Sequence, residues 1–484
     1  MGSTSSTVIK NIRWMIISKI IVYLLSIITI TLIPRYLGVE GYGQLNLVIS
    51  FVGLFFIFGD LGISSLIYRD VSKNPKKASE YFNKLFILKI VLLILTIIIV
   101  FFTTIFINKS IVIKELILYL GIPYILIYLI SSFYMCFYNA LQKIKYSAIY
   151  DILSKLFYVI FVICVIYFDF KLIGILIANV MSLLLVGLFL VLFLKKYITI
   201  KIKFDLKYII SKLKTTGYFA GISISTLVYY SADKLLVSFF IGDYQLGLYV
   251  IGYTFFWLLI SLIAIFNSAL FPVLSGYYNN IAKYRLVSEK FIKYIFIISV
   301  PILFGGVYLA NRIISLAFGS KFIGGLIAFQ IILLFFFIAA LNIYNLSTLL
   351  IKNKEKLYFF LVMFSAIFNI VVDLFVIPIY GIIGAAIVTV LSELIVFIGS
   401  YLYVKRNIQL SYWKQSIFPF IGSIIMIVCL FLTDEFLYPN GWFHNKFDVL
   451  ISILIGSIIY GLFLLFTKAI TIKETKAIIS RKID

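Results

Sequence analysis

Histidine and cysteine are nearly absent from this chain, which has one histidine and three cysteines in 484 residues. These side chains provide most zinc and transition-metal ligands, and cysteine pairs provide disulfide bonds. Cys136, Cys164 and Cys429 lie far apart within apolar runs, and His444 lies alone in a polar loop. The sequence therefore predicts no metal site, no disulfide framework and no bound cofactor.

Acidic residues are also scarce, with 19 Asp and Glu against 42 Lys and Arg, for a formal net charge of +23. A membrane enzyme that transfers or polymerises glycans needs acids or histidines presented together at the interface. The longest loop expected outside, about Asp434 to Asp448, contains no Asp-x-Asp pair. We therefore predict that the chain is not an enzyme and has no catalytic residues. A membrane glycan polymerase or transferase is the less favoured alternative.

Apolar residues are abundant instead. The composition is 63% hydrophobic and the mean hydropathy is +1.14, whereas a soluble globular chain has about 45–50% apolar residues. The apolar residues form runs of about 20, the length at which a helix crosses a hydrocarbon core of about 30 Å. The sequence predicts an all-α integral membrane protein with about 14 transmembrane helices.

Lys and Arg are concentrated in every second loop between these runs. The positive-inside rule therefore predicts a multi-pass protein of the cell membrane with both termini in the cytoplasm. Because the basic loops are short and dispersed among the spans, we expect them to meet membrane lipids and not nucleic acid. The opposite loops hold few cations: Arg35, Lys109, Lys114, Lys171, Arg312, Lys321 and Lys446.

Two spacings of glycine recur six spans apart. The hairpin Gly38–Gly43 has a counterpart in Gly242–Gly247, and Gly174–Ser182 has one in Gly384–Ser392. Because six is even, such repeats insert with the same orientation, as in transporters built from parallel halves. We predict a six-helix bundle over 1–194, a basic cytoplasmic linker over 195–216, a second six-helix bundle over 217–404, and two extra transmembrane helices with a basic tail over 405–484.

The linker itself has two interpretations. From Asp205 to Lys214 its apolar residues share one helical face, which favours an amphipathic helix at the cytoplasmic interface. A plain basic loop is equally compatible with the sequence, because topology alone requires lysines there.

Several short motifs follow one another over roughly the first 400 residues. They are Arg35–Gly38 with Tyr42–Gly43, Phe58–Gly62, Ala232–Lys234, Gly247–Tyr249, Phe271–Ser275 and Gly381–Ala386. In these motifs the chain resembles the polysaccharide transporter family (Wzx-type, O-antigen flippase) of the multidrug/oligosaccharidyl-lipid/polysaccharide exporter superfamily. The resemblance implies a flippase that moves a polyprenyl-diphosphate-linked oligosaccharide from the cytoplasmic to the outer leaflet. It also implies a cationic central cavity and, as partners, a glycan polymerase and glycosyltransferases of the same pathway.

Two relatives in the same superfamily stay open as alternatives. A peptidoglycan-precursor flippase and a small-molecule exporter share the two six-helix bundles, and the former can also have fourteen spans. The segment from Arg35 to Gly62 favours the polysaccharide branch.

Cations within the spans are candidate ligands for a diphosphate, because a charge at a helix centre costs about 2.5–3.5 kcal/mol on insertion scales. Lys19 and Lys234 lie on polar helical stripes, so we expect Lys19 to receive the diphosphate and Lys234 to meet it later. Lys89 and Lys155 lie at a depth similar to that of Lys19. Snorkelling to the headgroups stays open for Lys19, Lys89 and Lys155, and a structural ion pair with another helix stays open for Lys234. A helix pair with Asp151, four residues earlier, would also explain Lys155.

The acids within the spans can bind a proton or a sodium ion and so couple transport to a gradient. They can equally neutralise the four lysines. These acids are Asp60, Asp233, Asp373 and Glu393.

Polar and aromatic residues on the same helices can line the cavity, where a tyrosine can stack on a sugar ring. Packing between helices is the favoured alternative for any single tyrosine. The candidates are Tyr23, Ser26, Tyr230 and Tyr253.

Overall fold

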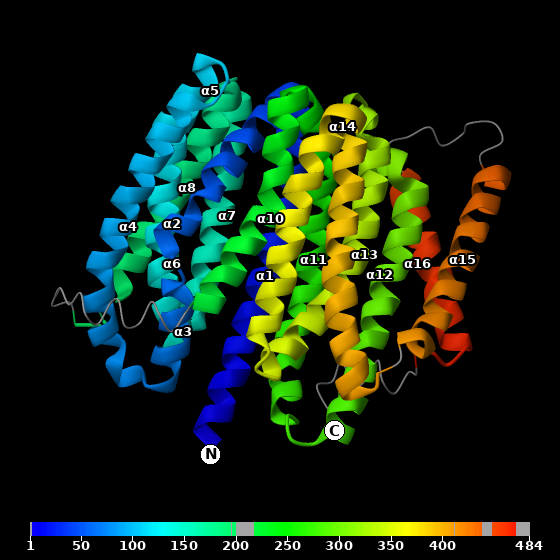
Figure 1. Ribbon diagram of the computed structural model, residues 1–484. Helices are drawn as coiled ribbons and strands as arrows, with labels where there is room; N and C mark the ends of the chain where they lie inside the picture. The colour runs from blue at the N-terminus through cyan, green and yellow to red at the C-terminus, as the bar shows by residue number, and fades with distance from the viewer. Residues whose placement is uncertain (1, 195, 200–216, 411, 438–447, 471–484) are drawn as a thin grey trace. The chain divides into compact units, whose positions relative to one another are not determined.

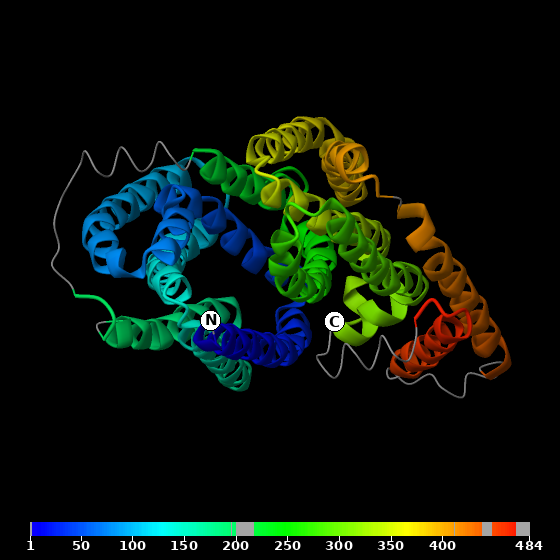
Figure 2. The same cartoon turned by 90° about the horizontal axis from the view of Figure 1, so that it is seen from below.

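The computed structural model describes residues 2–194, 196–199, 217–410, 412–437 and 448–470, which contain helices and no β-strand. Figure 1 labels the helices, and Figure 2 shows those of each unit nearly end-on. The elements of the first part of the chain are α1 (Gly2–Leu54), α2 (Phe56–Asp60), α3 (Ile63–Lys73), η1 (Pro75–Lys77), α4 (Ala78–Phe106), α5 (Ile111–Leu116), the π-helical turn η2 (Ile117–Gly121), α6 (Ile122–Ala140), α7 (Ile144–Tyr167) and α8 (Lys171–Leu194). Those that follow are α10 (Gly217–Ile241), α11 (Asp243–Gly276), α12 (Ile281–Ala317), η3 (Ser320–Gly325), α13 (Leu326–Ile351), α14 (Glu355–Ile408), α15 (Tyr412–Leu437) and α16 (Asp448–Phe466).

Twelve segments of the described residues are long and apolar enough to cross a membrane. Two of them, Arg13–Asp60 and Glu355–Ile408, contain 48 and 54 residues, about twice the length that one pass needs. Each contains a glycine with non-helical backbone angles, Gly38 (φ 72°) and Gly381 (φ 60°). Glycine adopts positive φ readily because it lacks Cβ. Each long segment therefore provides two passes, and the all-α architecture with about 14 transmembrane helices is confirmed.

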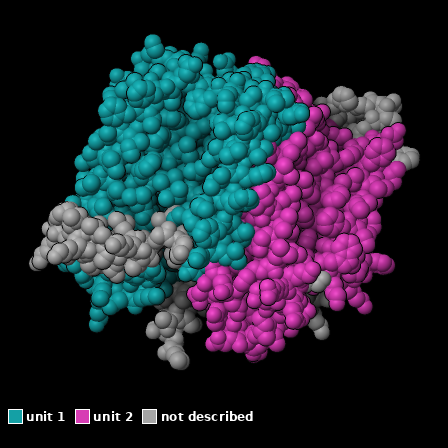
Figure 3. Space-filling model, viewed as in Figure 1, with its two compact units in different colours: residues 1–250, 355–385 teal, residues 251–354, 386–484 magenta. Residues whose placement is uncertain are grey.

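The described helices group into two compact units (Figure 3), and α11 and α14 contribute residues to both. These units have other bounds than the bundles predicted over 1–194 and 217–404, so that division stays a prediction. The amphipathic helix predicted from Asp205 to Lys214 lies outside the described residues. Unit 1 comprises residues 1–250 and 355–385, and unit 2 comprises residues 251–354 and 386–484.

In unit 1, α1 and α7 run parallel and are joined by hydrogen bonds near both ends. The side-chain amide of Asn11 donates to the carbonyl oxygen of Gln142 (3.0 Å), and the Tyr36 hydroxyl donates to the Asp169 carboxylate (2.9 Å). The bonded residues are 131 and 133 positions apart. The two helices therefore keep nearly the same register between Asn11 and Tyr36, which is the stretch of α1 that lies along α7.

The glycine repeat of the sequence recurs in the backbone. Gly38 and Gly242 both have positive φ, 72° and 94°. Gly174 and Gly384 make the same close approach, because a Cβ atom on either would lie 2.5 or 2.8 Å from the Cβ of the residue four positions earlier. Both pairs of matching positions therefore have similar local structures, which supports the predicted duplication.

The two glycine hairpins also contact each other reciprocally within unit 1. A Cβ atom on Gly43 would lie 1.8 Å from the carbonyl oxygen of Asp243, and one on Gly247 would lie 1.9 Å from that of Val39. Gly43 matches Gly247 in the repeat, and Val39 matches Asp243. The contact is therefore two-fold symmetric in its residues, and any side chain at either glycine would push the backbones apart.

We expect Gly43→Ala to destabilise the protein by about 1–3 kcal/mol, since an added methyl meets backbone that has no room to yield. Gly53→Ala, also on α1, is the matched control because a Cβ atom there meets nothing within 4 Å. Thermal unfolding of the detergent-purified variants measures both. Equal midpoints for the two variants would contradict the close contact.

In unit 2, α15 and α16 are attached to α12. Arg312 forms a two-pronged ion pair with Asp434 (3.0 and 2.8 Å), and the Tyr308 hydroxyl donates to the same carboxylate (2.7 Å). The Tyr460 hydroxyl of α16 donates to the carbonyl oxygen of Ile297 (3.0 Å). The two C-terminal helices are therefore fixed by polar contacts as well as by apolar packing.

Candidate functional site

Two lysines on the paired helices α1 and α7 lie within membrane passes and form no ion pair with a described residue. Lys155 donates to the Thr29 hydroxyl (3.0 Å), and its ammonium lies 5.3 Å from the centre of the Tyr158 ring. Lys19 is exposed. Among the described residues, no carboxylate lies within ion-pair distance of either ammonium. Cations that form no ion pair at this depth favour a water-filled cavity that can hold an anion.

The register of α1 and α7 puts Lys19 about level with Asp151, and these two residues interact electrostatically. The backbone of Lys155 lies one turn further along α7 than that of Asp151. The Lys155 side chain contacts Thr29 on α1 and does not form the helix pair with Asp151 that the spacing permits. Lys19, Lys155 and Asp151 therefore form a cluster with one net positive charge. We call these three residues the cationic cluster.

Lys89 differs from these lysines because it is compensated inside unit 1. Its side chain is 1% exposed and donates to the Gly59 carbonyl oxygen (2.6 Å) and to the Asp60 carboxylate (3.2 Å). Asp60 also accepts from the Ser64 hydroxyl (2.6 Å), across the break between α2 and α3. Lys89 thus satisfies the Gly59 carbonyl oxygen at the end of α2, where the helix is broken. The ion pair of Lys89 with Asp60 is an example of the neutralisation of lysines by acids that the sequence left open.

α10 and the first half of α14 run parallel in unit 1. A Cβ atom on Gly221 would lie 2.4 Å from the Phe359 ring, and one on Gly381 would lie 3.9 Å from the Ile241 side chain. Similar numbers of residues separate these contacts on the two helices. Each residue of α10 between these two contacts therefore lies about level with the residue at the matching position of α14.

Asp233 on α10 and Asp373 on α14 occupy such matching positions. Both are fully buried and interact electrostatically. The Tyr249 hydroxyl donates to Asp233 (2.7 Å), whereas neither oxygen of Asp373 has a hydrogen-bond partner among the described residues. The buried amide of Asn369, one turn before Asp373, is equally unsatisfied there. Buried unpaired polar groups are costly, and oxygen atoms so arranged suit a small hard cation or a proton.

Of the remaining predicted charges, Lys234 lies beside this carboxylate pair and Glu393 lies away from it. Lys234 is half-buried next to Asp233 on α10, and its backbone N–H donates to that carboxylate (2.7 Å). Glu393 lies in unit 2, where it accepts from the Asn342 amide (2.6 Å), and Ser400 donates to the same amide (3.2 Å). Of the four predicted acids, the structure therefore brings only Asp233 and Asp373 together.

The four predicted polar and aromatic residues differ in environment. Tyr23 and Ser26 are half-buried on α1, and the Ser26 hydroxyl donates to a carbonyl of its own helix (2.7 Å). Tyr230 is half-buried with its ring edge against Tyr229 (centroids 4.9 Å apart). Tyr253 is 2% exposed and packed among aromatic rings, as the packing alternative expects.

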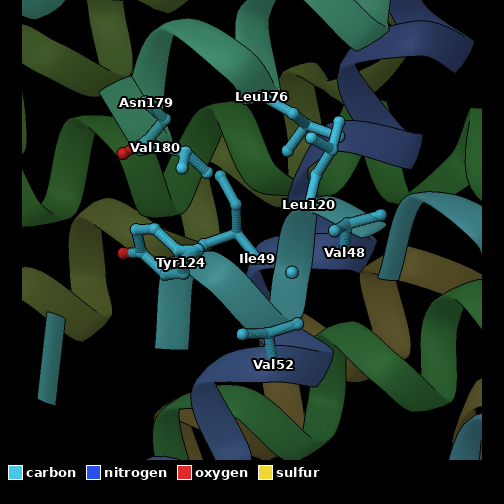
Figure 4. A pocket seen from close by; sticks show the side chains of 9 residues that line it. Val48, Ile49, Val52, Leu120, Tyr124, Leu176, Asn179 and Val180 are labelled. Atoms are coloured by element: carbon cyan, nitrogen blue, oxygen red, sulfur yellow. The ribbon is translucent and has the colours of Figure 1, made fainter. Parts of the chain in front are cut away.

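An aromatic region beside a small cavity in unit 1 is not among the sites predicted from the sequence. The spacing of Tyr124 and Tyr128, four residues apart on one face of α6, was the available signal. Figure 4 shows the Tyr124 hydroxyl pointing away from the aliphatic lining. The cavity has a volume of only about 10 Å³ and lies between α1, η2 with α6, and α8. It is lined by Val48, Ile49, Val52, Leu120, Gly121, Tyr124, Leu176, Asn179 and Val180.

No group of three His, Cys, Asp or Glu side chains suited to a metal ion occurs in the described ranges. The carboxylate pair offers two acidic side chains and an amide, a set that suits a monovalent cation or a proton better than a transition metal.

Comparison with known families and structures gives consistent results. Residues 8–278 match a family described as "Polysaccharide biosynthesis protein", and no curated protein sequence matches the chain. A structure of the lipid II flippase MurJ in an inward closed conformation superposes with a TM-score of 0.77 at 18% identity, covering 98% of this chain and 99% of that one.

Two transporters of the MOP superfamily are also similar in fold. An inward-facing multidrug resistance MATE family transporter gives a TM-score of 0.62 at 17% identity, over 80% of this chain and 94% of that one. A transporter from Pyrococcus furiosus gives 0.56 at 14% identity, over 81% and 95%. At these identities the similarity concerns the fold.

Proposed function

Because the chain belongs to the polysaccharide biosynthesis protein family, we propose that it flips a polyprenyl-diphosphate-linked oligosaccharide from the cytoplasmic to the outer leaflet. The chain is a multi-pass membrane protein of transporter fold, and family and fold are those of flippases and transporters and not of catalytic enzymes. The cytoplasmic side in this proposal is the side of both termini, where most Lys and Arg lie. The membrane is the cell membrane, and the partners are the polymerase and glycosyltransferases of the same pathway.

The observation that carries the proposal is the cationic cluster on α1 and α7. Lys19 and Lys155 lie within membrane passes without a carboxylate in ion-pair distance among the described residues. A diphosphate brings a compact double negative charge, so binding compensates the desolvation of both partners. The lipid tail stays in the bilayer while the charged headgroup crosses through the protein. Lys234 meets the headgroup later in this proposal.

The carboxylate pair Asp233 and Asp373 is the proposed coupling site. A sodium ion or a proton offsets the unpaired charge of Asp373, and its binding and release drive alternating access through the two halves. The unsatisfied oxygens of Asp373 and of Asn369 support this assignment.

A reconstituted transport assay tests the proposal. Proteoliposomes carry a polyprenyl-diphosphate-linked oligosaccharide with a fluorescent label on the glycan, and a membrane-impermeant quencher reports its leaflet. We expect the protein to exchange the label between leaflets faster than empty liposomes do. Equal rates in both preparations would contradict a flippase function.

The same assay addresses the second candidate function, a peptidoglycan-precursor flippase. The extensive superposition on the lipid II flippase MurJ favours this alternative. We expect lipid II to be exchanged more slowly than the oligosaccharide carrier. A faster exchange of lipid II would assign the chain to the alternative function.

A further inference from the structure

Three aromatic rings form one stacked group near the middle of two membrane passes in unit 1. The rings of Phe56 and Tyr128 are parallel, with centroids 4.5 Å apart and an angle of 9°. Tyr124 lies 6.0 Å from each of them, at 28° to Tyr128 and 37° to Phe56. Phe56 begins α2, and the two tyrosines share one face of α6. We call these three residues the aromatic platform.

The platform is accessible, unlike the aromatic core of the same unit. Tyr128 is 40% exposed, and Phe56 and Tyr124 are half-buried, whereas Phe82 and Phe133 are each 1% exposed. Accessible rings alone would also suit contact with lipid. The hydroxyl groups of the platform and the charges beside it distinguish contact with lipid from contact with water or a polar ligand.

The hydroxyls of Tyr124 and Tyr128 have no hydrogen-bond partner among the described residues. A tyrosine hydroxyl usually finds a partner when it is buried, and hydrocarbon offers none. Two adjacent free hydroxyls at mid-membrane depth therefore favour a water-filled cavity or a polar ligand over lipid.

The antiparallel packing of α6 and α7 brings the platform beside the cationic cluster. The Ser147 hydroxyl donates to the Asn139 side chain (2.7 Å) near the turn between these helices. Continuing that register puts Tyr128 level with Tyr158, whose ring lies 5.3 Å from the Lys155 ammonium. Tyr128 also interacts electrostatically with Asp151. An aromatic face, a lysine that forms no ion pair with a described residue, and a carboxylate thus lie in one region of unit 1.

We propose that the aromatic platform binds the sugar attached directly to the diphosphate, with one ring face stacked on Tyr128. The proposal rests on the flippase function above, and it assigns a sugar subsite to the same cavity. In a polyprenyl-diphosphate glycan the first sugar is bonded to the distal phosphate, so a phosphate site and a first-sugar site must adjoin. Lys19 and Lys155 hold the phosphates. The free tyrosine hydroxyls donate hydrogen bonds to the sugar hydroxyls or accept them, and the Asp151 carboxylate accepts hydrogen bonds from them.

The test compares two probes on the purified full chain, a polyprenyl diphosphate and the same lipid carrying one sugar. We expect Tyr128→Leu to weaken binding of the sugar-bearing probe by about threefold to tenfold, the range of an aromatic stacking contact. Binding of the bare diphosphate should change by less than about twofold. Tyr128→Phe keeps the ring face and should keep most of the affinity for the sugar-bearing probe.

Tyr119→Leu is the matched control, because Tyr119 lies in the same membrane pass and is 73% exposed, outside the platform. Phe56→Leu gives the same test if Tyr128→Leu does not fold. Equal losses for both probes, or no loss for either, would overturn the platform. Failure of the unmodified protein to bind either probe would instead overturn the flippase function.

Discussion

Replacing Lys19 and Lys155 together by alanine is expected to reduce transport of the lipid-linked glycan by tenfold or more. Each lysine lies in a membrane pass without an acidic partner within ion-pair distance in the described chain. A hydrogen bond to a charged group contributes about 1.5–3 kcal/mol, and about 1.4 kcal/mol corresponds to a factor of ten. Loss of both cations should therefore nearly abolish binding of the diphosphate.

Complementation of a strain that lacks its own flippase, with surface glycan as the readout, measures this effect at matched protein levels. Arginine at both positions should retain more activity than alanine, because the proposed binding of the diphosphate depends on the charge of the side chain more than on its shape. Lys145→Ala provides a control on α7, since Lys145 lies near the start of the helix over the Trp14 ring (5.5 Å). Full activity of the double alanine variant would leave both lysines as snorkelling side chains.

Asp373→Asn is expected to abolish the dependence of transport on its coupling ion and to lower the rate about tenfold or more. Neither oxygen of Asp373 has a partner in the described residues, so the carboxylate stores an unfavourable charge until a cation or a proton offsets it. A ligand at 100 times its Kd stabilises the protein by about 2.7 kcal/mol. Sodium or protons should therefore raise the melting temperature of the unmodified protein and leave that of the variant unchanged.

Glu355→Gln is the matched control for this variant, since Glu355 lies in the first turn of the same helix and outside the carboxylate pair. Melting curves in sodium and choline salts of equal ionic strength, repeated across pH, separate a sodium site from a proton site. In ion-free buffer Asp373→Asn should melt no lower than the unmodified protein, because it removes a buried uncompensated charge. An unchanged ion response in the variant would exclude Asp373 from the coupling site.

The membrane architecture followed from the sequence because bilayer thickness sets the length of an apolar helix. Fourteen apolar runs therefore became about fourteen passes, even where α1 and α14 each continue through a turn. The glycine motifs were equally informative, since positive φ at Gly38 and Gly242 is a local backbone property. The reciprocal contact between the two hairpins was beyond sequence reasoning, because it joins segments that are distant in the chain.

The partners of the intramembrane charges could not be derived from spacing. Lys19, Lys89 and Lys155 have similar depths in the sequence, yet Lys89 reaches Asp60 and Lys155 reaches Thr29 on a different helix. A long lysine side chain can reach several neighbours, so its partner depends on which helices pack beside it. The i,i+4 spacing of Asp151 and Lys155 allowed a pair that the tertiary structure does not form.

The sequence by itself determined the membrane class, the number of passes and the family motifs, because each depends on composition, length or local backbone geometry. Only the tertiary structure decided which charges are compensated. It paired Lys89 with Asp60, brought Asp233 level with Asp373, and put the accessible rings of the aromatic platform beside the cationic cluster. The physical reason is that the cost of a buried charge depends on its neighbours in space, and these come from helices far apart in the sequence.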